Sequence, residues 1–274
     1  MGQVEADVVL VGEDIHLNFG GIKALTAVEF QIKEGQIMSI IGPNGAGKTC
    51  LINCITGYYC PQKGRILFNG QDILGHSPDK IAKLGISRTF QNPSTYPNMT
   101  TLDILMAARY MHSRASILDA LIYFGRSRRE ELANRRIVEQ MVNFSHIEDL
   151  RKRPIFTMSY GQRKQVEIAR ALTMQPKIIL LDEPMSGLDD VMKEIMSELI
   201  LNMHKKGMTI ILIEHDMQAV MELSHSIIVL DYGQKIAEGT PTEIFQNPLV
   251  AEVYLGGVSD TTRSSEIDII GSDT

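Results

Sequence analysis

The pattern of apolar and polar positions changes character twice along the chain. The first part begins with strand-like segments at Val8–Leu17 and Val28–Ile32, followed by the almost wholly apolar Gln36–Ile41. Short apolar runs that are rich in branched residues predict buried strands. The last of these runs leads into a glycine-rich loop and then into a helix. Farther on, Arg65–Phe68 followed by Asn69-Gly70 predicts a β-hairpin.

The middle of the chain, from Thr101 to about Leu150, is helical in character and has few strand formers. Its run Arg126–Arg136 is densely charged, which favours a solvated helix face and leaves a partner or acidic-lipid site as the alternative. An apolar patch precedes this run, and its shortness favours a core or subunit contact over membrane insertion. The patch consists of Ile117, Leu118, Leu121, Ile122 and Phe124.

After Pro176 short apolar strands alternate with helices again. The strand patterns are Lys177–Leu181, Thr209–Ile213 and Ser226–Leu230. This alternation predicts a parallel sheet with helices on both faces. The helix between the first two strands carries a stripe that we expect to face the core. The stripe consists of Met192, Ile195, Met196, Leu199 and Met203.

Composition limits the classes of protein that fit. With 274 residues and 44% hydrophobic content the chain can bury one large core or two small ones. The net charge of -6 argues against a general nucleic-acid binder. No apolar run approaches the roughly 20 residues of a membrane span, and no signal pattern opens the chain, so we expect membrane contact only through a partner. The polar, acidic segment 258–274 predicts a flexible tail.

The three cysteines, Cys50, Cys54 and Cys60, lie close together without any sign of a disulfide framework. Cys50 and Cys54 have helical spacing, but a zinc site needs two further ligands. We therefore expect all three to be small core residues rather than metal ligands.

The segment Gly42–Thr49 matches the phosphate-loop pattern G-x-x-x-x-G-K-[ST] in full and lies between a predicted strand and a predicted helix. Its glycines let backbone N–H groups approach an anion, and the helix start adds a partial positive charge. Lys48 would reach the β- and γ-phosphates, and the Thr49 hydroxyl would bind Mg²⁺. A chance loop rarely combines this pattern with this context.

Two further segments add chemistry to the phosphate loop. Asp182 and Glu183 follow an apolar strand, at the edge where ligands of α/β proteins bind. Asp182 could hold Mg²⁺ through water, and Glu183 could act as general base towards an attacking water. Ser159 and Gly161 begin a strongly helical stretch, which makes a second anion site. Two anion sites far apart in one chain suggest head-to-tail dimers with each nucleotide between two chains.

These motifs resemble the ATP-binding subunits of ABC transporters over nearly the whole chain. The family's signature L-S-G-G-Q corresponds to Met158–Gln162, with Tyr160 in place of the first glycine, a variant that resembles branched-chain amino-acid transporters. The resemblance implies an α/β P-loop fold with a RecA-like core, an antiparallel β subdomain and an inserted helical subdomain. It predicts a single cassette over residues 9–257, with the helical subdomain at about 92–175.

The resemblance also assigns roles to single positions. Gln91 matches the glutamine that senses Mg²⁺ and the attacking water, His215 the switch histidine, and Phe19 the aromatic residue that stacks on adenine. Ser186–Asp189 matches the dimer-contact loop. The Mg²⁺ ligands would be Thr49, Gln91 and Asp182. The expected nucleotide-binding residues are Phe19, Gly42, Pro43, Asn44, Gly45, Ala46, Gly47, Lys48, Thr49, Cys50, Ser159, Gly161 and Gln162.

The subfamily features lie at both ends and in the middle of the chain. The opening Phe19–Ala24, the long helical stretch with its basic run and the ending Pro248–Gly257 all resemble the branched-chain amino-acid type. Leu188-Asp189-Asp190 departs from that subfamily's Leu-Asn-Pro. Relatives that transport urea, short-chain amides or aromatic acids share most of these features, so the cargo stays open.

The expected function is ATP-driven import at the cytoplasmic face of the cell membrane, to which the chain would bind peripherally. The expected partners are a second ATP-binding subunit, identical or different, two transmembrane permease subunits and an extracytoplasmic substrate-binding protein, with no nucleic acid. A non-transport ABC ATPase of repair or translation is the first alternative. A catalytically idle cassette is the second alternative, and intact Lys48, Asp182, Glu183 and His215 argue against it. A small-molecule kinase with the same loop is the third, and Ser159–Gln162 together with His215 would have no role there.

Overall fold

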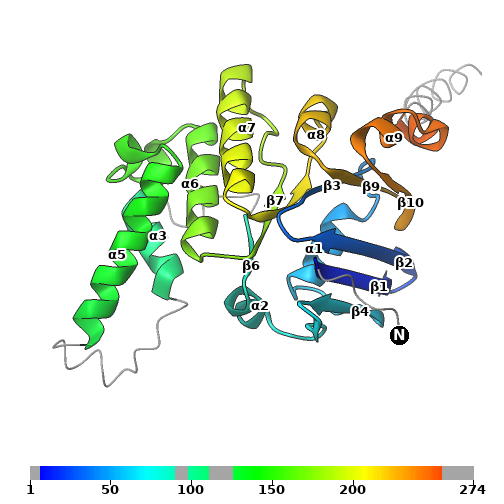
Figure 1. The fold of residues 1–274 in the computed structure, drawn as a ribbon, viewed down its shortest axis with the longest axis horizontal. Coiled ribbons are helices and arrows are strands. Elements are labelled where there is room, and N and C mark those ends of the chain that lie inside the picture. The colour runs from blue at the N-terminus through cyan, green and yellow to red at the C-terminus, as the bar shows by residue number, and fades with distance from the viewer. Residues whose placement is uncertain (1–6, 90–97, 111–125, 255–274) are drawn as a thin grey trace, which may run out of the picture. The chain divides into compact units, whose positions relative to one another are not determined.

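The computed structural model describes residues 7–89, 98–110 and 126–254. The chain divides into two compact units, the first formed by Met1–Gly75 with Leu212–Thr274 and the second by His76–Ile211. Strand β8, Thr209–Ile213, contains the boundary between them. Each unit has strands, helices and a hydrophobic core of its own (Figure 1). Within the described ranges, no helix is long and apolar enough to cross a membrane.

The first unit contains a four-stranded antiparallel sheet in the order β2-β1-β4-β5. These strands are β1 (Val8–Phe19), β2 (Ile22–Lys33), β4 (Lys63–Phe68) and β5 (Gln71–Asp72). β4 and β5 form the predicted hairpin, and its turn residues Asn69 and Gly70 have φ values of 49° and 75°. Positive φ at both turn residues matches the twist of the flanking strands. The hairpin prediction is confirmed.

The first unit also holds β3 (Ile37–Ile41), β9 (Ser226–Asp231) and β10 (Gln234–Gly239). β3 pairs with β9 in parallel, as predicted, whereas β10 pairs with β9 antiparallel. Strand β10, which was not predicted from the sequence, makes this sheet mixed rather than wholly parallel. The reason is the two-residue turn Tyr232-Gly233, whose φ values of 42° and 77° allow a direct hairpin.

The helices that accompany these strands in the first unit include α1 (Lys48–Ile55), α8 (Met217–Leu223) and α9 (Pro241–Phe245). One core cluster joins β3 and β9 to α8, α9 and the segment that follows α9. Its buried members are Ile41, Val220, Ile227, Val229, Ile244 and Val250. The C-terminal segment is thus packed against the strand that leads into the phosphate loop.

The second unit contains a parallel pair of strands, β6 (Ile86–Arg88) and β7 (Ile178–Asp182). α2 (Pro78–Leu84) precedes β6, and α7 (Asp190–Lys205) follows β7 after a short turn. In the predicted stripe of α7, Met196, Leu199 and Met203 are buried, whereas the side chain of Ile195 is 38% exposed. Ile195 therefore lies beside the buried face of the helix rather than on it.

Three longer helices of the second unit pack on one another: α3 (Thr101–Tyr110), α5 (Arg126–Phe144) and α6 (Tyr160–Thr173) (Figure 1). Two short 3-10 helices, Glu148–Leu150 and Ile155–Thr157, join α5 to α6. The shared core has ten buried members, which are Ile104, Leu105, Val138, Val142, Ile147, Leu150, Ile155, Met158, Val166 and Ala169.

The charged run of α5 is largely exposed where its side chains are described, with Arg135 and Arg136 facing solvent. This agrees with a solvated helix face for that part of the run, and the alternative of a partner or acidic-lipid site also needs this exposure. The apolar patch at 117–124 and the predicted tail at 258–274 lie outside the described residues. The proposed limits of the cassette and of its helical subdomain stay predictions.

The cysteines differ in exposure. Cys54 is buried on α1, and burial raises the pKa of its thiol to about 12. Cys50 is half-buried, and burial raises its pKa as well. Cys60 is exposed, so the prediction of a core residue is wrong there. Cys60 follows the end of α1 in a surface turn, where the helical pattern that placed the other two no longer applies.

Candidate functional site

The predicted phosphate loop follows the fully buried strand β3 and leads into α1. The loop has positive φ values at Gly42 (148°), Gly45 (80°) and Gly47 (101°), a region that residues with a Cβ rarely adopt. A Cβ on Gly42 would lie 2.1 Å from the carbonyl oxygen of Leu230, and one on Gly47 would lie 2.8 Å from that of Ala24. Two of the three glycines are therefore required by close backbone packing as well as by conformation.

Lys48 is buried at the first position of α1. Its Nζ donates hydrogen bonds to the carbonyl oxygens of Gly42, at 2.7 Å, and Pro43, at 2.9 Å. The ammonium group is thereby held against two carbonyl groups of the loop itself, where it can meet a phosphate oxygen. Gly47, at the N-cap, has no side chain that could cap the helix, which favours anion binding by the first N–H groups of α1.

The remaining loop residues differ in accessibility. Asn44, Gly45 and Thr49 are exposed, whereas Ala46 is buried. The backbone N–H of Gly233 donates to the carbonyl oxygen of Ala46 at 3.0 Å, which ties the β9-β10 hairpin to the loop. The exposed Thr49 hydroxyl is free to face a ligand in the position that the sequence predicts for a Mg²⁺ contact. Cys50 is only half-buried on the same helix.

Phe19 ends β1 with 44% of its side chain exposed. Its ring meets that of Tyr59 edge to face, with centroids 5.0 Å apart and an interplanar angle of 74°. An exposed aromatic ring is suited to stacking, and the adenine contact of Phe19 stays a prediction. Sequence reasoning missed Tyr59, because the two rings come from segments 40 residues apart and no motif links them.

His215 is exposed in the segment between β8 and α8. Glu214 before it is buried, and its carboxylate accepts a hydrogen bond from the backbone N–H of His215 at 3.1 Å. Asp216 after it caps α8, because its Oδ1 accepts from the N–H groups of Gln218 and Ala219. Both neighbours fix the backbone, so the imidazole is presented to solvent from an ordered position.

Asp182 ends β7 in the second unit and is buried. The Nη2 of Arg88 donates to its Oδ2 at 2.6 Å in an ion pair whose side chains are 10% and 0% exposed. The backbone N–H of Asp182 donates to the Thr89 hydroxyl at 3.3 Å. Sequence reasoning assigned no role to Arg88, since a partner 94 residues away leaves no local signal.

Glu183 follows Asp182 with a φ of 51°, unusual for a residue with a Cβ. Its side chain is half-buried. The N–H of Ser186 donates to the carbonyl oxygen of Glu183 at 3.3 Å, which closes a turn between β7 and the predicted dimer-contact loop. Non-glycine residues in this conformation are frequent at functional sites, where the surroundings enforce them.

Ser159 caps α6, as the sequence predicts. Its Oγ accepts from the N–H of Gln162 at 3.2 Å, and the Gln162 Oε1 accepts from the N–H of Ser159 at 3.1 Å. Gln162, which was expected to bind nucleotide, therefore completes a capping box in this structure. A Cβ on Gly161 would meet Met192 Cε at 2.8 Å, so this glycine allows α6 to approach α7 closely.

The residues predicted for Mg²⁺ lie in different units: Thr49 in the first and Asp182 in the second. Gln91 lies outside the described residues. The Oδ1 of Asp182 is buried and has no hydrogen-bond partner among the described residues, so it suits a bound water of a hydrated cation. In the described ranges no three His, Cys, Asp or Glu residues form a metal cluster.

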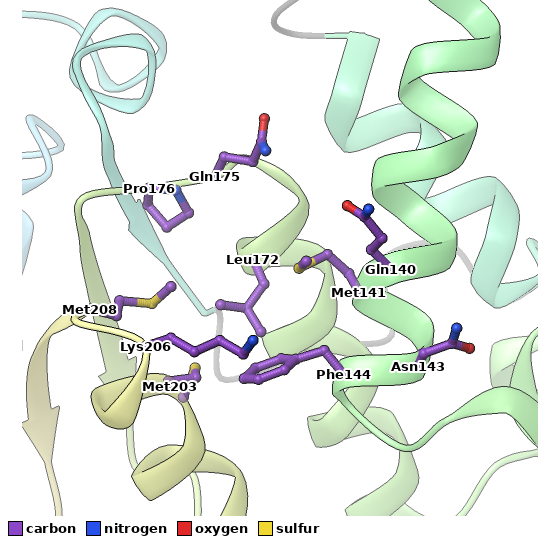
Figure 2. A pocket seen from close by; sticks show the side chains of 10 residues that line it. All are labelled: Gln140, Met141, Asn143, Phe144, Leu172, Gln175, Pro176, Met203, Lys206 and Met208. Atoms are coloured by element: carbon purple, nitrogen blue, oxygen red, sulfur yellow. The ribbon is translucent and has the colours of Figure 1, made fainter.

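A pocket of about 660 Å³ opens elsewhere in the second unit. Figure 2 shows its lining side chains on α5, on the end of α6 and on the end of α7. The apolar part is formed by Met141, Phe144, Leu172, Met203 and Met208, and none of its lining residues was predicted as a site residue. Volume alone therefore does not locate the chemistry in this chain.

A buried strand, a glycine loop and a helix that begins with a lysine define a phosphate-binding P-loop nucleoside triphosphatase. The family model "ABC transporter" matches residues 25–186, and the model "Branched-chain amino acid ATP-binding cassette transporter" matches residues 234–260. The chain belongs to the family of ATP-hydrolysing subunits of ABC transporters.

Similar proteins of known name come from bacteria and archaea. The chain is 36% identical to the high-affinity branched-chain amino acid transport ATP-binding protein BraF of Pseudomonas aeruginosa, over 90% of this chain and 98% of that protein. It is 35% identical to the probable branched-chain amino acid transport ATP-binding protein LivG of Archaeoglobus fulgidus, over 95% of this chain and 98% of that protein. The solved structure of a nucleotide-free ATP-binding cassette from an ABC transporter superposes on this chain with a TM-score of 0.79 and is 34% identical to it. The match covers 90% of this chain and 98% of that structure's chain.

Proposed function

We propose that this chain powers the import of branched-chain amino acids or a related small solute by binding and hydrolysing ATP. The observation that carries the ATP-binding part is the loop Gly42–Thr49, where Lys48 Nζ lies across the loop on two carbonyl oxygens. A bound phosphate would offer the ammonium a charged acceptor, and charge-assisted hydrogen bonds are stronger than those to carbonyl groups. The cargo part rests on the names of the relatives.

We assign the chemical step to Glu183. Its carboxylate stands at the end of a buried strand next to Asp182, and it would accept the proton of the attacking water. Asp182 would hold water of the hydrated Mg²⁺ through its buried Oδ1, while Thr49 would contact the ion from the phosphate loop. Mg²⁺ would neutralise charge on the transferred phosphoryl group. His215 and Gln91 would contact the γ-phosphate and the attacking water.

The start of α6 supports a head-to-tail dimer. Ser159 is exposed there, yet its own hydroxyl is ordered by the capping box with Gln162. A helix start that is capped and exposed can donate to an anion from outside the chain. We propose that Ser159 and Gly161 contact the γ-phosphate of a nucleotide on a second ATP-binding subunit, and that ATP binding closes this dimer.

The remaining partners follow from the same assignment. Two transmembrane permease subunits would carry the cargo, and the chain would bind them peripherally at the inner face of the membrane. An extracytoplasmic substrate-binding protein would deliver the solute. The relatives named above are transport proteins, which favours this function over a repair or translation ATPase.

Uptake in cells that carry a Lys48→Ala chain tests the proposal. Removing the ammonium should lower ATP affinity about 10- to 100-fold, because a charged hydrogen bond contributes about 1.5–3 kcal/mol. We expect uptake of labelled leucine, isoleucine and valine to fall to background. Lys235→Ala is the matched control, since the Nζ of Lys235 pairs with the exposed Glu238 of the same unit at 2.6 Å. If the Lys48→Ala chain still supports full leucine uptake but no longer supports the uptake of urea or an amide, the proposed cargo is wrong.

A further inference from the structure

Lys164 lies one turn into α6, two residues after the capping Gln162, and is buried. Its Nζ donates to the carbonyl oxygen of Glu183 at 2.6 Å and to that of Ser186 at 2.7 Å. These carbonyl groups stand at the two ends of the turn that follows β7. One ammonium group therefore ties the first turn of α6 to both ends of the turn that carries Glu183.

The second observation is the backbone of Glu183 itself. Its φ of 51° is unfavourable for a residue with a Cβ, so the surroundings must maintain it. The charged hydrogen bond from Lys164 fixes the direction of the Glu183 carbonyl group, and with it the peptide plane that follows. The backbone orientation at Glu183 sets the direction of its Cα–Cβ bond, from which the carboxylate extends.

The third observation concerns Tyr160, the residue that departs from the family's signature glycine. The Nζ of Lys164 lies 4.9 Å from the centroid of the Tyr160 ring, within cation–π range. The same ring packs against Gly187, where an added Cβ would lie 3.4 Å from the ring atom Cε1. Tyr160 thus contacts both Lys164 and the loop after Glu183, while its neighbour Ser159 begins the helix.

We infer that Lys164, supported by Tyr160, is a positioning residue that couples the two ATP sites of a dimer. A nucleotide on the partner subunit would contact the start of α6, and the Lys164 bonds would transmit the position of that helix to this chain's own Glu183. The inference rests on the proposed function, because it assigns Glu183 to the chemical step. It concerns contacts within the second unit only.

Kinetics of the full-length chain, with its partner subunits where turnover needs them, tests this inference. Lys164→Met keeps the length of the side chain but removes the charge and all three donors. We expect kcat to fall at least about 10-fold while the Kd for ATP stays within about twofold, since the phosphate loop is untouched. Lys164→Arg restores the charge and should recover kcat to within about threefold.

Tyr160→Leu is the second variant, and it decides the matter should Lys164→Met not fold. It removes the ring while leaving both carbonyl bonds, so we expect kcat to fall about threefold with unchanged ATP affinity. Lys206→Met is the matched control, because Lys206 also lies over an aromatic ring, that of Phe144 at 5.4 Å, in the same unit (Figure 2). Its kcat should equal that of the unmodified chain.

Two outcomes overturn the inference. The first is a Lys164→Met or Tyr160→Leu chain that turns over at the unmodified rate. The second is a loss of kcat that is matched by equal losses of ATP affinity and thermal stability, which would show a purely structural role. A different result, an unmodified chain that binds no ATP, would instead contradict the proposed function.

Discussion

The phosphate loop and the Glu183 turn begin alike and are stabilised differently. Each follows a strand of five fully buried residues, β3 or β7, and each contains backbone with positive φ. In the phosphate loop the positive values fall on Gly42, Gly45 and Gly47, which tolerate them, and the lysine that holds the Gly42 carbonyl group is only six residues away. In the second turn the positive value falls on Glu183, and a distant lysine holds the adjacent carbonyl group.

This difference shows which residues determine the conformation of each turn. The positive φ values of the phosphate loop are allowed by its own glycines, and the lysine that holds its carbonyl groups belongs to the same motif. The Glu183 turn depends on packing of α6 against β7 and α7, which is a property of the whole second unit. We therefore expect local substitutions to damage the first turn and distant ones to damage the second.

Gly42→Ala should have the largest effect. The added Cβ would lie 2.1 Å from the Leu230 carbonyl oxygen. The backbone fixes the positions of both atoms, so no side-chain rotation can relieve the clash. We expect the free energy of unfolding to fall by more than about 4 kcal/mol, or the first unit not to fold. Gly45→Ala is the control, because its Cβ would meet nothing within 4 Å and only conformational strain remains. Equal melting temperatures for the two variants would contradict the close packing at Gly42.

Arg88→Met should come next. It removes one partner of a buried ion pair and leaves the Asp182 carboxylate without its charged donor, which costs about 3 kcal/mol or more. Arg65→Met breaks an ion pair with Glu13 of the same 2.6 Å length, but those side chains are 63% and 42% exposed. The free energy of unfolding of the Arg65→Met control should therefore fall by only about 0–1 kcal/mol. Denaturant unfolding of both variants checks the contrast, and equal losses would show that burial does not matter here.

Glu183→Gly should change stability less, and in the opposite direction. Glycine adopts a φ of 51° without strain, so we expect the folded state to gain about 1 kcal/mol while ATP hydrolysis is lost. Calorimetry and an ATPase assay on the same preparation check both parts. A lower melting temperature would mean that the Glu183 side chain stabilises the turn more than its conformation costs.

The capping boxes at Thr240 and Ser159 give the smallest and most specific contrast. Hydrogen bonds from the backbone and side chain of Thr240 hold the pKa of Glu243 below its usual value of 4.5. The folded state thus gains stability from ionised Glu243 above the unfolded pKa and loses it as pH falls through the lowered value. Glu243→Gln should therefore lower the melting temperature at about pH 6 but not at about pH 2.

The corresponding box at Ser159 contains Gln162, which does not titrate. Ser159→Ala should therefore cost the same stability at both pH values, typically about 1 kcal/mol. A Glu243→Gln effect that persists at low pH, or a Ser159→Ala effect that disappears there, would contradict these assignments.

Much of the fold and the phosphate loop could be predicted because the signals are local. Buried strands of branched residues, a hairpin dipeptide and the loop pattern each lie within about ten residues. The contacts of Asp182 with Arg88 and of Glu183 with Lys164 could not, because they depend on how separate elements pack. Gln162 shows a different limit: its side chain caps its own helix, a role that the signature motif did not indicate, and its nucleotide contact stays a prediction.

The measurement that tests the central claim most directly is ATP turnover and dimerisation of a Glu183→Gln chain. Glutamine keeps the size of the side chain and cannot accept the proton, so we predict that hydrolysis falls about 10²- to 10⁴-fold while ATP still binds. With Mg²⁺ and ATP the variant should accumulate as a stable dimer in size-exclusion chromatography. Turnover equal to that of the unmodified chain, with no ATP-dependent dimer, would contradict the account.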